Sequence, residues 1–201
     1  MNCARAITRP ESIATWPPLK WLLAIAGVFV ASLSFQLHVP INHDVAWLLD
    51  GSRRILRGGV IGRDFIDVSP PLIVWLGMPA VLLSELTNLY LGTVFRLYVA
   101  ALVLVNLALC WSLLACLDMS TRLRTQFFFV LSVICIAIQG YDFGQREHLL
   151  LILTLPYVLL IVARVSKVDP PGQLVAIVSL AAIVGFCIKP HFLAIPFFLE
   201  L

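Results

Sequence analysis

Ionisable side chains in this chain gather where long apolar runs begin or end. Four such groups occur: His43-Asp44, Arg63-Asp64 with Asp67, Arg146-Glu147-His148, and Lys189 with His191. Charged groups at the edge of a bilayer are costly to desolvate, so they are seldom placed there without a function. If all four groups meet on one side of a membrane, we expect them to form an active site or an ion path.

The composition predicts an integral membrane protein. Of the 201 residues, 61% are hydrophobic and 12% are charged, and the mean hydropathy is +0.99. Such a chain has too few polar residues to cover a water-soluble core. The net charge of +3 is small and its basic residues are dispersed, which argues against nucleic-acid binding. We expect the five cysteines to be free and to form no metal site.

The apolar runs predict about five full membrane spans and a truncated sixth. They cover residues 21–39, 93–117, 126–139, 149–163 and 174–188, and a last run begins at residue 192. The first run is longer than the apolar core of a cleaved signal peptide and more runs follow, so we expect an uncleaved helix. The predicted fold class is all-α, a polytopic membrane helix bundle.

The stretch 71–86 decides the predicted topology. It is apolar but short, and it contains Gly77 and Pro79, which favours an interfacial or re-entrant helix over a span. With this stretch not crossing, the basic residues of the N-terminal tail and of two short loops share the cytoplasmic side, as the positive-inside rule requires. We expect a multi-pass protein of the inner (plasma) membrane with a cytoplasmic N-terminus. The four charged groups then face the extracytoplasmic side.

Residues 40–92 form the predicted first extracytoplasmic loop, which contains helices next to the membrane. Apolar residues recur at helical spacing over 44–57 and charged residues lie mostly on the other face, which predicts an amphipathic helix. Gly58-Gly59 should end it. Asp44 falls at or just before its first turn, where a carboxylate can cap free amide groups. On local sequence, a plain N-cap explains Asp44 as well as a catalytic role does.

The order of these features resembles the polyprenyl-phosphate-dependent GT-C glycosyltransferases, and most closely their protein O-mannosyltransferase and lipid A aminoarabinose transferase branch. The resemblance covers nearly the whole chain. Its matching segments are His43-Asp44-Val45-Ala46-Trp47, Arg63-Asp64-Phe65, Pro70-Pro71-Leu72-Ile73-Val74-Trp75-Leu76, Phe95-Arg96-Leu97, Arg146-Glu147, and Gly185 with Lys189-Pro190. Members of this family are more than twice as long, so the resemblance implies that residues 1–201 are an N-terminal transmembrane module.

The chain departs from this family at two places. Val68-Ser69 stands before Pro70-Pro71, where the family often has a lysine for the lipid phosphate, and Arg63 is the nearest replacement. Glu147 stands where the family usually has aspartate, and Asp142 competes for that position.

The resemblance implies transfer of a sugar from a polyprenyl-phosphate donor to a lipid, glycan or protein acceptor among the membrane lipids. A carboxylate would take the acceptor proton and cations would hold the departing phosphate. Asp44 is the implied base, and Glu147 would orient the acceptor or bind a divalent cation, the one cofactor left open. The implied phosphate ligands are Arg146, Lys189 and Arg63. Further substrate contacts are expected from His43, Asp64, Asp67, His148 and His191.

Structural alternatives stay open for these residues. Arg146-Glu147 could be a local ion pair that caps a helix, Lys189 could snorkel to the interface, and the histidines fit structural roles better than catalytic ones. A secondary transporter would also carry charges in a membrane, but the sequence has no internal repeat and its charges lie at helix ends. A third alternative is a non-catalytic membrane fragment.

Overall fold

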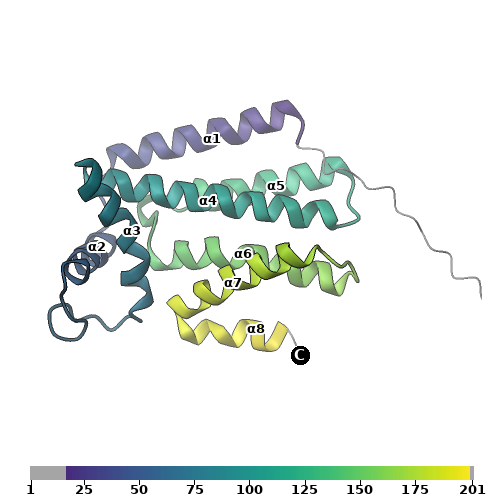
Figure 1. Ribbon diagram of the computed structural model, residues 1–201. Coiled ribbons are helices and arrows are strands. Elements are labelled where there is room, and N and C mark those ends of the chain that lie inside the picture. Colours follow the sequence, from purple (N-terminus) through teal and green to yellow (C-terminus); the bar gives the residue numbers. More distant parts are fainter. Residues whose placement is uncertain (1–16, 200–201) are drawn as a thin grey trace, which may run out of the picture.

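In the computed structural model the described residues, 17–199, form a bundle of helices (Figure 1). No β-strand occurs among these residues, so the all-α prediction is confirmed for this part of the chain. The elements in chain order are α1 (Leu19–His38), α2 (His43–Leu56), α3 (Leu72–Thr87), α4 (Leu91–Cys116), α5 (Thr121–Ile136), the 3-10 turn η1 (Gly140–Asp142), α6 (Arg146–Val165), α7 (Gly172–Ile188), η2 (Pro190–Leu193) and α8 (Ala194–Leu199).

Three helices, α1, α4 and α6, are long and apolar enough to cross a membrane. They support the prediction of a membrane protein. The predicted five full spans are not confirmed, because α5 and α7 have 16 and 17 residues, fewer than the roughly 20 of a typical span. The run that begins at residue 192 is divided between η2 and the short α8. The run 126–139 extends past the end of α5, because residues 137–139 belong to the turn before η1.

The bundle is held together around α6, which packs against both α4 and α7. Gly185 of α7 makes this contact close, since a Cβ there would lie 2.7 Å from Thr154 Cγ2 and 2.9 Å from Leu153 Cβ. α1 lies on the outside against α5 and exposes large apolar side chains such as Leu23 and Val30. An outer surface of this kind is stable in lipid and costly in water.

α2 and α3 lie at one end of the bundle, where α3 crosses the direction of the longer helices (Figure 1). With 16 residues, α3 is one of the shorter apolar helices and is not among the three that are long enough to cross a membrane. Ser52 of α2 donates a hydrogen bond of 2.7 Å to the carbonyl of Val74 in α3. Gly77 permits this close approach, because a Cβ there would clash with the Ser52 hydroxyl. α3 begins at Leu72, directly after Pro70-Pro71.

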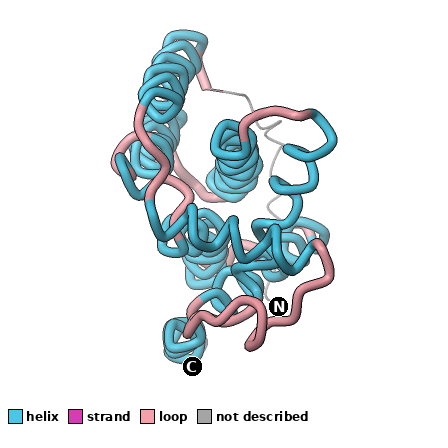
Figure 2. The backbone as a smooth tube through the Cα atoms, turned by 90° about the vertical axis from the view of Figure 1, so that its left-hand side faces the viewer, coloured by secondary structure: helices cyan, strands magenta, loops and turns pink. Residues whose placement is uncertain are grey.

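All four charged groups lie at this same end of the bundle. Asp44 is in the first turn of α2, Asp64 and Asp67 are in the connection to α3, Glu147 begins α6, and Lys189 follows α7. They come together because successive long helices run in opposite directions. Figure 2 looks at this end and shows the connections in front of longer helices seen nearly end-on.

Candidate functional site

The start of α2 shows that Asp44 is not the N-cap of this helix. The N-cap of α2 is Asn42, whose side-chain oxygen accepts a hydrogen bond of 2.9 Å from the backbone N–H of Asp44. Asp44 is therefore not the cap, because a neighbouring side chain already satisfies the free amide group. The carboxylate of Asp44 faces His43 Nε2 at 3.0 Å and keeps 44% of its side-chain surface exposed. The carboxylate is therefore partly open to solvent.

Asn42 also connects α2 to a second carboxylate. Its side-chain nitrogen donates to Asp142 Oδ1 of η1 at 3.2 Å, and Asn42 itself is buried. The backbone N–H of Asp44 and the carboxylate of Asp142 thus both bond to the side-chain amide of Asn42, which is 100 residues from Asp142 in the sequence. The structure associates the N-terminus of α2 with Asp142, the competing second carboxylate, and it places Glu147 in a different contact.

The turn between α2 and α3 carries the Arg63–Asp64 pair. Arg63 Nη2 lies 2.8 Å from Asp64 Oδ2, which also accepts the backbone N–H of Val60 at 2.8 Å. The mutual hydrogen bond raises the pKa of Arg63 and lowers the pKa of Asp64. Both side chains face solvent and form a local turn. Arg63 does not line the cavity described below.

Asp67 organises the end of the same connection. Its Oδ2 accepts the indole N–H of Trp47 at 2.9 Å, and its Oδ1 accepts the backbone N–H of Ser69 at 2.6 Å. Partial burial raises the pKa of Asp67, but the bonds from Ser69 and Trp47, with the nearby charge of Arg146, lower it overall. The Ser69 hydroxyl in turn receives a hydrogen bond from Arg146. These hydrogen bonds connect α2 to the start of α6 through residues 67–69.

Glu147 and Lys189 form the second connection between elements. Lys189 Nζ forms an ion pair with Glu147 Oε1, across 42 residues of sequence. The Lys189 side chain is 23% exposed and that of Glu147 is 54% exposed. The simple snorkelling interpretation of Lys189 is incomplete, because its ammonium has a defined carboxylate partner on another helix.

These two connections border one cavity at the end of the bundle. It has a volume of about 290 Å³. Arg146 and Lys189 supply its cations, and Ser69 and His191 add polar groups. Its complete lining is Val68, Ser69, Pro70, Arg146, Ile188, Lys189, Pro190 and His191. A guanidinium fork, an ammonium and a hydroxyl around one hollow are the groups that bind phosphate oxygens.

His148 has a structural environment. It is 1% exposed. Its Nδ1 accepts the backbone N–H of Gly144 at 2.9 Å, and its Nε2 lies 2.9 Å from the carbonyl of Cys135. Because Nδ1 accepts, the proton is on Nε2, which donates to Cys135. Both ring nitrogens are used within the chain, so we assign His148 to the junction of α5 and α6 rather than to a substrate.

A divalent cation does not fit the side chains present. Within residues 17–199, no group of three or more His, Cys, Asp or Glu side chains is placed to hold a metal ion. Glu147, the residue for which a cation was left open, has Lys189 as its partner. We derive no step through a metal.

Sequence reasoning missed the residues that organise the site. Asn42 was passed over in favour of Asp44, although an asparagine before a helix is a preferred N-cap. In the sequence, Ser69 stands out only as a departure from the family pattern, and Trp47 only as part of the segment that begins at His43. Their long-range partners, Arg146 and Asp67, carry no signal in the local sequence. No protein-family model, curated protein or solved structure matches the chain.

Proposed function

We propose that this protein is a membrane glycosyltransferase that moves a sugar from a polyprenyl-phosphate donor to an acceptor at the end of the bundle where α2 and α3 lie. One observation carries the proposal. Arg146 and Lys189, from different helices, line a single cavity of about 290 Å³ together with the Ser69 hydroxyl. The surrounding helices are apolar enough to sit in lipid, where a lipid-linked phosphate is found.

In this proposal Arg146 and Lys189 hold the donor phosphate. Without donor, Lys189 is neutralised by Glu147 and Arg146 is bonded to neutral Ser69. The donor phosphodiester has two non-bridging oxygens and can therefore bond to the Arg146 guanidinium and the Lys189 ammonium together, so it competes with Glu147 for the ammonium. Donor binding would then release the Glu147 carboxylate beside the phosphate, where it can orient an acceptor hydroxyl.

Asp44 is the proposed general base. The acceptor hydroxyl attacks the anomeric carbon, the bond from that carbon to the phosphate oxygen breaks, and the phosphate leaves with the electron pair. The acceptor proton passes to Asp44, whose carboxylate is exposed at the same end of the bundle. The bond from Asn42 to Asp142 keeps this end of α2 near the start of α6.

The test compares three variants of the protein in proteoliposomes, with polyprenyl-phosphate mannose and polyprenyl-phosphate aminoarabinose as donors. Asp44→Asn should lower transfer about a hundredfold or more at normal yield. Lys189→Met should weaken donor binding as well as turnover, and Arg146→Lys should be damaging because it loses the planar fork. Asp50→Asn, on the same helix but bonded to Arg54, is the matched control and should transfer normally.

A purely structural role for these side chains predicts a different pattern. Yield would fall in Lys189→Met and Arg146→Lys, while activity per folded molecule would not change. Normal specific activity in Asp44→Asn would end its assignment as the base.

A further inference from the structure

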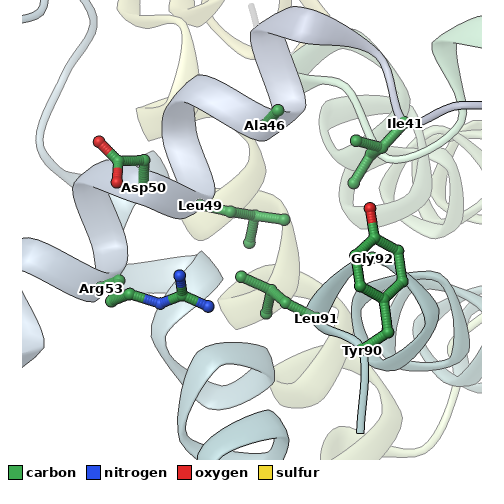
Figure 3. A pocket seen from close by; sticks show the side chains of 8 residues that line it. All are labelled: Ile41, Ala46, Leu49, Asp50, Arg53, Tyr90, Leu91 and Gly92. Atoms are coloured by element: carbon green, nitrogen blue, oxygen red, sulfur yellow. The ribbon is translucent and has the colours of Figure 1, made fainter.

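A second cavity lies between α2 and the start of α4, apart from the proposed donor site. It has a volume of about 190 Å³ and shares no lining residue with the first cavity. It is lined by Ile41, Ala46, Leu49, Asp50, Arg53, Tyr90, Leu91 and Gly92 (Figure 3). Pockets for drug-sized ligands measure roughly 300–1,000 Å³. This one fits a smaller group.

Arg53 is the unusual residue of this cavity. Two other arginines near the end of α2 have carboxylate partners at 2.8 Å: Arg54 pairs with Asp50, and Arg57 pairs with Glu85. Arg53 Nε is buried and has no hydrogen-bond partner among the described residues. A buried guanidinium nitrogen without a partner is costly. The guanidinium also lines the cavity (Figure 3) and has no ion-pair partner among the described residues, so an anion there would supply one.

The side chains around Arg53 indicate where the anion would sit. Figure 3 shows the Arg53 guanidinium extending toward Leu91, between the two helices, and the Asp50 carboxylate turned away from the cavity. Asp50 is held by Arg54. The cavity therefore offers one unpaired cation against a wall of apolar side chains from Leu49 and Leu91.

The exposed side chains between α3 and α4 favour a lipid over a dissolved ion. Tyr90, which lines the cavity, is 68% exposed, and Leu89 beside it and Leu86 near the end of α3 are 55% and 72% exposed. Exposed leucines beside a tyrosine at the end of an apolar helix are typical of the membrane interface. A headgroup phosphate could reach Arg53 there while its acyl chains cover the exposed leucines.

We propose that the cavity between α2 and α4 binds the phosphate of an anionic phospholipid through Arg53. The bound lipid would fasten α2 and the end of α3 to the membrane span α4, independently of the proposed glycosyl transfer.

The experiment uses the full chain in nanodiscs of phosphatidylcholine with increasing phosphatidylglycerol. It measures the unfolding temperature and the phosphatidylglycerol that stays bound in native mass spectrometry. In the parent protein both should rise with phosphatidylglycerol. Arg53→Gln should weaken lipid retention about tenfold or more, whereas Arg57→Gln, which removes the exposed arginine that follows α2, should retain lipid like the parent. Arg53→Lys should recover part of the retention.

Two further comparisons test the site and the identity of its ligand. In pure phosphatidylcholine, Arg53→Gln should be at least as stable as the parent, because glutamine lacks the buried Nε that has no hydrogen-bond partner. If this variant fails to fold, Ala46→Leu narrows the cavity without altering Arg53 and should also reduce lipid retention. Equal losses in Arg53→Gln and Arg57→Gln would overturn the site in favour of general surface charge. Stabilisation by inorganic phosphate equal to that by phosphatidylglycerol would overturn the lipid as ligand.

Discussion

Glu147, in the first turn of α6, forms an ion pair with Lys189, the residue that ends α7. The pair joins two helices at the mouth of the cavity that also contains Arg146. The ion pair gives Glu147 and Lys189 a structural role. In the proposed function, the donor phosphate displaces Glu147 from Lys189. The proposed function therefore depends on whether this ion pair is permanent or is exchanged for an ion pair between Lys189 and the donor phosphate.

Separate replacement of Glu147 and Lys189 distinguishes a permanent ion pair from an exchangeable one. Exposed ion pairs contribute about 0.2–1 kcal/mol, so Glu147→Gln and Lys189→Met should each change the unfolding temperature little. Glu147→Gln should bind a polyprenyl-phosphate donor at least as well as the parent, because it removes the competitor for Lys189, and Lys189→Met should bind it more weakly. Donor titration by tryptophan fluorescence measures donor binding in the two variants. Equal weakening in the two variants would contradict the exchange.

The cap of α2 should be separable from its carboxylate. Asn42→Ala removes the side-chain bond to the Asp44 N–H and the bond to Asp142, and it should lower stability by about 0.5–2 kcal/mol. Asp44→Asn leaves both bonds in place and should unfold like the parent. Thermal unfolding followed by circular dichroism compares the two variants. A larger loss in Asp44→Asn than in Asn42→Ala would restore Asp44 as a stabilising residue of this turn.

The connection between α2 and α3 should loosen in acid. Hydrogen bonds from Ser69 and Trp47 lower the pKa of Asp67, so the ionised form stabilises the folded connection. This contribution is present above the ordinary aspartate pKa of about 3.9 and is lost as the pH falls through the lowered value. Limited acid proteolysis with pepsin should cut the connection increasingly below about pH 4.

Asp67→Asn should be cut at all these pH values and should lose most of the pH dependence. Asp64→Asn is the control, because Asp64 also has a lowered pKa but its side chain bonds within its own turn, to Arg63 and Val60. Cleavage of the parent that does not change with pH would show that Asp67 does not hold the connection.

Single-cysteine labelling should test the sidedness. Tyr141 in η1 is 51% exposed and lies at the end with α2, and Asp118 is exposed in the connection at the opposite end. With the native cysteines replaced, Tyr141→Cys should react with an impermeant thiol reagent added outside intact cells, and Asp118→Cys should react only after the cells are opened. Gly144 is a poorer site, since its φ of +85° and the nearby Phe95 ring disfavour a side chain. Labelling in the reverse order would contradict the predicted orientation.

The sequence by itself determined the helical class, the membrane character and the grouping of charges. These follow from composition and local pattern: apolar runs predict helices, and Pro70-Pro71 and Gly58-Gly59 mark where α3 begins and α2 ends. It predicted about five full spans, and the structure confirms three helices of sufficient length and hydropathy. Hydrophobicity does not report backbone conformation, so apolar runs do not show where each helix ends.

Only the tertiary structure decided which charges meet. Asp44, Arg63, Arg146 and Lys189 were grouped by their common end of the bundle, but helix packing places Arg146 and Lys189 in one cavity and leaves Arg63 in a local turn. The partners of Asn42 and Glu147 are 100 and 42 residues away. Such contacts depend on where α6 and α7 pack, which Gly185 helps to set by close approach. Local sequence cannot specify them, because the side chains meet only after the helices have assembled.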